Sequence, residues 1–219
     1  MQSSVNKPYS ASCDNNREPI FSVLERLLNN CRSVLESGSG TGQHAVYFAE
    51  RLPQLVWQCS DLKENHAGIR QWLGEAALPN TPAPLLLDVE LHDMSALNHD
   101  AVFSANTIHI MSWDAVKLMI QGVGKLLPRG GLFILYGPFN YGNRYTSDSN
   151  ARFDEWLKQR DPESGIRNFE DVEKRANDAQ LTLHEDIAMP ANNRIPVSYT
   201  HLRAHETVRW ISYAVFCLK

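Results

Sequence analysis

The sequence has few of the features that mark extracellular, membrane or nucleic-acid-binding proteins. Its four cysteines among 219 residues follow no close-spaced pattern, which disfavours both a disulfide framework and a cysteine-rich metal site. No apolar run is long enough to span a bilayer, and residues 1–12 lack the apolar segment of a signal peptide. The net charge of −4 disfavours a general binder of nucleic acids or anionic membranes. We therefore expect a reduced, cytoplasmic protein.

Repeats and low-complexity tracts are also lacking, so the chain is predicted to form one α/β domain. Its 219 residues, 43% of them hydrophobic, can bury a substantial core. Residues 1–16 are polar and predicted as loop, and the first helix is predicted to begin at Arg17 with Pro19 in its first turn. Short apolar runs then alternate with helical patterns. Strands are predicted at 33–35, 55–59, 85–87, 100–106, 132–136 and 181–188.

The stretch from residue 34 to residue 49 is the most informative part of the chain. A short buried strand ends near Leu35, glycines follow at 38, 40 and 42, and apolar residues from Ala45 onward have helical spacing. Such a turn lets a ligand approach the backbone closely, because no side chain blocks it. We expect exposed N–H groups at this turn and at the helix N-terminus to bind part of a nucleotide.

The spacing of these glycines favours one cofactor over another. A dinucleotide fingerprint runs G-x-G-x-x-G, but here Gln43 takes the place of its third glycine. Glu36 precedes the turn, where its charge would repel a pyrophosphate and attract an ammonium group. S-adenosylmethionine (SAM) carries an ammonium and a sulfonium and has no phosphate, so the pattern favours SAM. The alternatives are an NAD-dependent oxidoreductase and a tight turn in another kind of α/β protein.

Polar residues at later strand ends are expected to complete the cofactor site. Asp61 follows the second strand, where a carboxylate reaches the ribose hydroxyls, although it could instead cap the next helix. Asp88 is placed to accept a hydrogen bond from the adenine amino group with Val89 against the ring, or it is an ordinary turn aspartate. The predicted cofactor-binding residues are Glu36, Gly38, Ser39, Gly40, Gly42, Asp61, Leu62, Asp88, Val89 and Asn106.

Three residues are candidates for a catalytic role. His109 follows the fourth strand, and a neutral imidazole there could take a proton from a hydroxyl or amine. A histidine between two isoleucines is, alternatively, a packed core residue. Tyr9 and Arg17 belong to an N-terminal segment that we expect to cover the crevice as a lid, the alternative for residues 1–12 being a frayed terminus.

Taken together, the chain resembles a family of small methyltransferase-like proteins that is catalogued as a domain of unknown function, within the class I SAM-dependent methyltransferases. The resemblance covers residues 7–194. It is carried by residues 16–20, 38–45, 57–58, 60–61, 87–89, 106, 109, 136–139, 149–150, 153–154 and 189–193. It implies a Rossmann-like, mostly parallel seven-stranded sheet with an antiparallel last strand, helices on both faces, and SAM over the carboxyl edge of the strands. It implies no particular substrate.

The chain departs from the family pattern in three places. Ser37 replaces a small or branched apolar residue, and Ser164 replaces a tryptophan. After residue 194 the resemblance stops, and residues 199–207 look like a translated sequencing adapter. We therefore expect residues 1–194 to form the domain, with a lid and helix in 1–30, and residues 195–219 to be an atypical tail that is not native to the fold.

The predicted tail contains a pattern that resembles a zinc site only in part. His201 and His205 are four residues apart, but the H-E-x-x-H arrangement and a third ligand are missing, so no metal is expected. The predicted function is SAM-dependent methyl transfer to a small-molecule acceptor, with no nucleic acid or membrane as partner. A non-catalytic SAM-binding protein is the main alternative, and NAD-dependent oxidoreduction is a weaker one.

Overall fold

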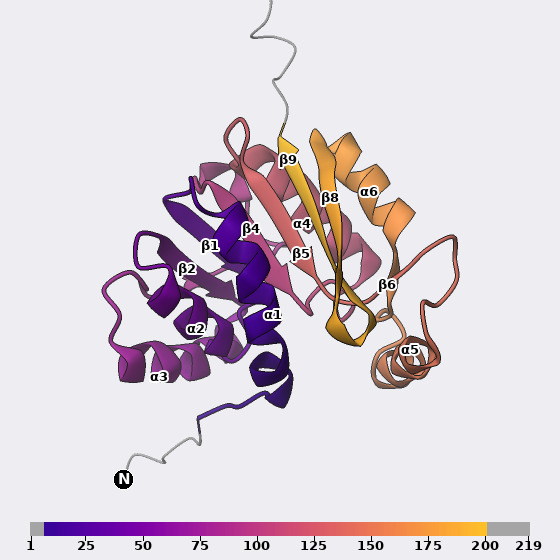
Figure 1. Ribbon diagram of the computed structural model, residues 1–219, viewed down its shortest axis with the longest axis horizontal. Helices are drawn as coiled ribbons and strands as arrows, with labels where there is room; N and C mark the ends of the chain where they lie inside the picture. Colours follow the sequence, from indigo (N-terminus) through magenta and orange to yellow (C-terminus); the bar gives the residue numbers. More distant parts are fainter. Residues whose placement is uncertain (1–6, 201–219) are drawn as a thin grey trace, which may run out of the picture.

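Seven strands form one mixed sheet at the centre of the protein (Figure 1). The computed structural model describes residues 7–200, and the sheet order is β3-β2-β1-β4-β5-β9-β8. Every neighbouring pair is parallel except β5–β9 and β8–β9, so only β9 runs against the others. The strands are β1 (Ser33–Ser37), β2 (Val56–Asp61), β3 (Leu85–Leu86), β4 (Ala101–Ala105), β5 (Leu132–Tyr136), β8 (Leu181–Met189) and β9 (Asn193–Thr200). The predicted architecture, with its antiparallel last strand, is confirmed.

Helices cover both faces of this sheet. The helices are α1 (Ala11–Leu27), α2 (Gln43–Arg51), α3 (His66–Ala76), α4 (Trp113–Leu126), α5 (Asp148–Arg160) and α6 (Phe169–Asp178). α1, α2 and α3 pack on one face, and α4 and α6 pack on the other. A small parallel pair, β6 (Phe139–Asn140) and β7 (Arg167–Asn168), lies apart from the main sheet. None of the helices in residues 7–200 combines the length and apolar character needed to span a bilayer.

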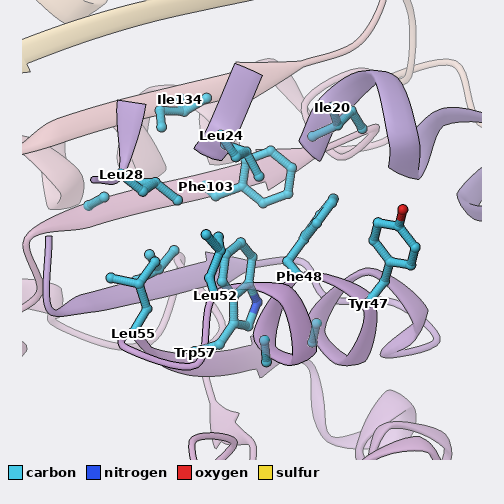
Figure 2. Close-up of a cluster of buried hydrophobic side chains, with 14 of the residues drawn as sticks. Ile20, Leu24, Leu28, Tyr47, Phe48, Leu52, Leu55, Trp57, Phe103 and Ile134 are labelled. Atoms are coloured by element: carbon cyan, nitrogen blue, oxygen red, sulfur yellow. The ribbon is translucent and has the colours of Figure 1, made fainter. Parts of the chain in front are cut away.

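An aromatic cluster forms the core beneath α1 and α2 (Figure 2). Phe48 of α2 contacts Trp57 of β2 and Phe103 of β4, with ring centroids 5.3 and 5.8 Å apart. Ile20 and Leu24 of α1 are fully buried against the same cluster. Burial of this apolar surface supplies the main force that holds α1 on the sheet.

The first helix is longer than predicted. It begins at Ala11, so Pro19 lies inside it rather than in its first turn. A proline in a helix interior loses a hydrogen bond and crowds the preceding turn, which is why the sequence pattern placed the helix start later. Tertiary contacts compensate for this cost: Asn16, one turn before Pro19, is 9% exposed and bonded to α2 through His44.

The predicted boundary between residues 194 and 195 falls inside β9. Ile195 and Val197 are fully buried, and Val197 pairs with Ile134 of β5. Residues 195–200 are therefore an integral part of the sheet. The rest of the predicted tail, with His201 and His205, lies outside the described residues.

The strand order fixes where a ligand can bind. From β1 the chain winds outward through β2 and β3, and it then returns to place β4 on the other side of β1. The connections after β1 and β4 thus leave in opposite directions. In open α/β sheets this switch point opens a crevice at the carboxyl ends of the two strands. The candidate site is at that edge.

Candidate functional site

The turn after β1 needs glycine at two positions for reasons of space. Gly38 and Gly42 have φ of 76° and 89°, a region that side-chain-bearing residues rarely adopt. A Cβ at Gly38 would lie 2.6 Å from the Thr107 side chain, and one at Gly42 would lie 3.2 Å from Ile69 Cα. These glycines bring the turn close to the segment after β4 and to α3.

The N–H groups of this turn are used inside the protein. Gly38 N and Ser39 N donate to Ser60 O at 3.0 and 3.1 Å, and Gly42 N donates to Ser39 O at 2.9 Å. Gly40 N donates to Asp61 Oδ2 at 2.6 Å. The expectation of outward-pointing N–H groups is therefore wrong for these four residues. A phosphate cradle depends on such free donors, so the turn is poorly suited to a pyrophosphate.

Glu36 lies in the interior, not at the mouth of the turn. It is the fourth residue of β1, 2% exposed, and its Oε2 accepts a hydrogen bond from Trp57 Nε1 at 3.1 Å. Burial raises the pKa of its carboxyl to about 7. Near neutral pH the group is therefore only partly charged. The electrostatic argument made from the sequence requires a full negative charge, which this environment weakens.

Asp61 joins the ends of β1 and β2. One carboxylate oxygen accepts from Gly40 N, and the other accepts from Leu62 N and Asn65 Nδ2, both at 2.7 Å. Asp61 thus fixes the glycine turn relative to the segment that follows β2. Beside it, Leu62 is 40% exposed and offers an apolar surface at the same edge.

Asp88 and Val89 form part of a turn beyond β3. Asp88 Oδ1 accepts from Glu90 N at 3.0 Å, and the Asp88 carbonyl accepts from His92 N at 2.8 Å. The turn role foreseen as the alternative is present, and the adenine contact stays a prediction. Val89 is partly buried and packs against the core beneath α4.

Asn106 and His109 come together at the ends of β4 and β5. Asn106 has φ of 56°, and its N–H donates to Tyr136 O at 2.8 Å. A Cβ placed on Gly137 would lie 3.5 Å from His109 Nδ1 and 3.8 Å from Asn106 Oδ1. The absence of a side chain at Gly137 therefore leaves room beside both polar groups.

His109 is 4% exposed and packs edge-on against Phe153, with ring centroids 5.4 Å apart. Its Nδ1 has no hydrogen-bond partner among the described residues. Burial lowers the pKa of the imidazole to about 4, and Arg167 adds to the effect. The ring is thus neutral at physiological pH, and one buried nitrogen is left without a partner. Buried polar atoms are seldom left so.

The segment that leads into α1 is bonded to side chains of α2 and α3. Gln43 Oε1 accepts from Ser10 N at 2.6 Å, and Gln43 Nε2 donates to Ser10 O at 3.2 Å. Trp72 Nε1 donates to Pro8 O at 2.7 Å, and the Lys7 ammonium lies 3.5 Å from the centre of the Trp72 ring. Residues 7–17, the lid segment, which include the first residues of α1, are therefore bonded to the first residue of α2, at the helix N-terminus that a dinucleotide would need.

Asn16 connects the lid segment to the sheet. Its Oδ1 lies 2.7 Å from His44 Nε2, and burial lowers the pKa of His44 to about 4, so a neutral His44 donates this bond. The Tyr136 hydroxyl at the end of β5 interacts with the side chains of both Asn16 and Asn193. One hydroxyl thus links α1 to the start of β9.

Tyr9 and Arg17, predicted as catalytic, both interact with the Asp14 carboxylate. Tyr9 is 63% exposed and its hydroxyl donates to Asp14, which pairs with Arg17 at 2.7 Å. Within residues 7–200, no hydrogen bond, ion pair or ring contact joins either residue to His109. The same part of the chain contains no group of three metal-ligating side chains.

A comparison with protein families identifies the family of this chain. The profile of a family described as "protein of unknown function (DUF938)" matches residues 7–200. The chain belongs to the DUF938 family. The match includes residues 195–200 of β9, which the sequence resemblance left out.

Solved structures with the same fold include several that are named as methyltransferases. An O-methyltransferase family protein from Burkholderia thailandensis superposes on 87% of this DUF938 protein with a TM-score of 0.74 and 16% identity. Human N-acetylserotonin methyltransferase in complex with SAM superposes on 87% of the chain with a TM-score of 0.74 and 11% identity. The mitomycin 7-O-methyltransferase MmcR superposes on 87% with a TM-score of 0.74 and 13% identity. The superposed region is 57%, 53% and 55% of these chains, so the DUF938 protein spans just over half their length. At these identities the likeness establishes the class I methyltransferase fold.

Three residues of the site were not assigned a role from sequence. Gln43 was noted only as a missing glycine, whereas it holds the lid segment. Trp72 was given no role, whereas its indole N–H donates a hydrogen bond to the lid backbone. Asn16 belonged to the family pattern, and its place in a predicted loop hid its function. Because each of these contacts joins distant parts of the chain, no local pattern reveals them.

Proposed function

We propose that this DUF938 protein binds SAM at the switch point between β1 and β4 and transfers its methyl group to a small molecule. The observation that carries the proposal is the glycine turn, whose donors are satisfied internally and whose following helix begins with Gln43, the residue bonded to the lid segment. A nucleotide ligand without phosphates suits such a turn, and a dinucleotide does not. The class I methyltransferase fold supports the same choice.

The residues at this edge can be given roles toward SAM. The Asp61 carboxylate, held by Gly40 and Asn65, would accept hydrogen bonds from the ribose hydroxyls, and the exposed part of Leu62 would pack on the adenine ring. Asp88 and Val89 would bound the adenine side. Glu36 favours a nearby ammonium group when it is ionised. SAM itself would supply a methyl group activated by a sulfonium.

His109 is the residue we assign to proton removal. A base with a pKa of about 4 does not deprotonate a hydroxyl in advance. An oxygen that gains a methyl group becomes strongly acidic, however, and its proton can then pass to a weak base. The unpartnered Nδ1 beside Gly137 fits this late transfer. Most of the rate would come from positioning and exclusion of water.

Calorimetry with SAM, S-adenosylhomocysteine and NAD tests the binding half of the proposal. We expect both sulfur ligands to bind and NAD not to bind. Asp61→Asn should weaken S-adenosylhomocysteine at least tenfold, because a charged acceptor for ligand and turn is lost, equivalent to about 1.4 kcal/mol. Asp171→Asn, an exposed change on α6, is the control and should leave affinity unchanged. Tighter binding of NAD than of SAM would refute the proposal.

A methyl-transfer screen against a metabolite library tests the catalytic half. With an acceptor found there, His109→Asn should lower turnover by well over tenfold and change S-adenosylhomocysteine affinity less than twofold, as expected for a proton acceptor. Unchanged turnover would remove His109 from the mechanism. SAM binding with no transfer to any compound would favour the non-catalytic alternative.

A further inference from the structure

A cavity lies at the β8–β9 turn, and Arg194, which lines it, is hydrogen-bonded to Gly137 after β5. It is an open cavity of about 430 Å³ formed by the loop after β6 and the turn between β8 and β9. Figure 1 shows this turn at the same end of the molecule as α5 and the lower end of α1. The residues that line the cavity include Tyr141, Thr146, Ala188, Met189, Asn193 and Arg194.

The backbone of the cavity wall is joined directly to the site at β4 and β5. Arg194 N donates to Gly137 O at 2.8 Å, and Gly137 N donates to Arg194 O at 3.2 Å. Gly137 is the residue whose missing side chain leaves room beside His109 and Asn106. Gly137 therefore links the backbone of the cavity wall to the proposed proton acceptor.

The lining carries balanced charge. Arg194 donates from Nε to Asp186 Oδ1 at 2.9 Å and pairs through Nη2 with Asp186 Oδ2 at 2.8 Å. The Tyr141 hydroxyl donates to the same carboxylate at 2.7 Å. Burial raises the pKa of Tyr141 above its usual range, so the phenol stays neutral. A charged ligand would have to compete with this existing pair.

The rest of the lining is uncharged and partly fixed. The Tyr141 ring stacks on Phe169 with centroids 5.1 Å apart, and Asn193 Nδ2 donates to Pro190 O at 3.1 Å. Met189 adds a polarisable thioether, and Thr146 a hydroxyl. Flat aromatic and thioether surfaces with a few amide and hydroxyl groups are typical of sites for small, uncharged ring compounds.

We infer that this cavity binds the methyl acceptor and that the acceptor is an uncharged small molecule with a ring and a hydroxyl group. The inference rests on the proposed function. In the transfer, the new C–O bond forms as the donor's C–S bond breaks, and the bonding pair stays on sulfur. The hydroxyl proton passes to His109 Nδ1. The volume suits a compound of two or three fused rings.

Three indole compounds of similar size test the charge preference: tryptophol is neutral, indole-3-acetate anionic and tryptamine cationic. The chain has five methionines, and labelling their methyl carbons gives resolved NMR probes. Tryptophol should shift the Met189 signal, whereas Met94 and Met119, 2% and 0% exposed in the core, should not move. The charged analogues should bind at least tenfold more weakly.

Variants of exposed Ala188 locate the binding. Ala188→Trp fills the cavity and should weaken tryptophol at least tenfold, whereas Leu118→Trp, on 41%-exposed Leu118 of α4, should have no effect. Ala188→Asp should shift the preference toward tryptamine. Absence of tryptophol binding, equal binding of the charged analogues, or binding that survives Ala188→Trp would overturn the inference.

Titration of the same samples with S-adenosylhomocysteine separates the two proposals. If S-adenosylhomocysteine binds and tryptophol does not respond to Ala188→Trp, the acceptor inference fails and the proposed function stands. If tryptophol binds as described and S-adenosylhomocysteine does not bind at all, the cavity is real but the proposed function fails.

Discussion

At the scale of single residues, Glu36 shows how context decides what a charged side chain can do. The sequence placed it just before a glycine turn, where an exposed carboxylate would select a cation. Both faces of the central sheet are covered by helices, so four successive residues of β1, from Val34 to Ser37, are buried. A carboxyl in this strand therefore has a pKa of about 7. Periodicity alone does not distinguish a strand covered on both faces from one that ends at the surface.

The raised pKa of Glu36 has a measurable effect on stability. A carboxyl whose pKa rises on folding stabilises the fold below the unfolded value of 4.5 and loses that contribution as pH rises through about 7. Glu36→Gln has no carboxyl to ionise. Between pH 5 and pH 8 its free energy of unfolding should therefore rise by up to about 3 kcal/mol relative to that of the native chain. Urea unfolding at the two pH values, followed by tryptophan fluorescence, measures the difference.

Comparing Glu36→Gln with the native protein cancels the pH dependence that other buried groups contribute. His44 and His109 have lowered pKa values, so their contribution is lost as pH falls below about 6.5 toward 4, in both proteins alike. A constant difference between Glu36→Gln and the native chain across this range would show that the Glu36 carboxyl is ionised throughout.

At the scale of elements, the lid segment is where sequence and structure differ most. The six strands predicted from apolar periodicity lie within a few residues of β1, β2, β3, β4, β5 and β8, whereas β9 was not predicted because residues 195–219 were assigned to a tail. The start of α1 does not follow from this periodicity, since Pro19 dominates the local pattern. The contacts that extend α1 come from α2, α3 and β5.

Gln43 should control how firmly the lid segment is held. Gln43→Ala removes two hydrogen bonds to Ser10, and we expect dissociation of S-adenosylhomocysteine to become about fivefold faster, at roughly 1 kcal/mol for the pair. Gln54→Ala, an exposed change after α2, is the matched control. Stopped-flow dissociation rates give the answer, and equal rates for the two variants would mean that the segment does not cover the ligand.

At the scale of the whole molecule, more of the fold than of the site could be predicted from the sequence. The order of strands, glycine turn and acidic strand ends carries the class I architecture, which depends on local patterns repeated along the chain. The partners of Asn16, Tyr136 and Asn193 depend on distances across the sheet, and no pattern near any one of them encodes these. The cavity at the β8–β9 turn is likewise formed by residues that lie far apart in the sequence.

The place of β9 in the sheet can be tested directly. Val197 is fully buried between strands, so Val197→Ala should lower the free energy of unfolding by about 2 kcal/mol. Thr182→Ala on the neighbouring strand, at a partly exposed position, should cost much less. Thermal and urea denaturation measure both changes. No effect of Val197→Ala would mean that residues 195–200 do not contribute to the fold.

The hydroxyl of Tyr136 has a consequence for the order of events in a catalytic cycle. It interacts with the side chain of Asn16 in the lid segment and with that of Asn193, which lines the cavity. On the proposed function, the lid segment must move for the cofactor to be exchanged, and this movement withdraws Asn16 from the Tyr136 hydroxyl, whose other partner is Asn193. Loading of the donor and loading of the acceptor would then follow one another in a fixed sequence, instead of occurring at random.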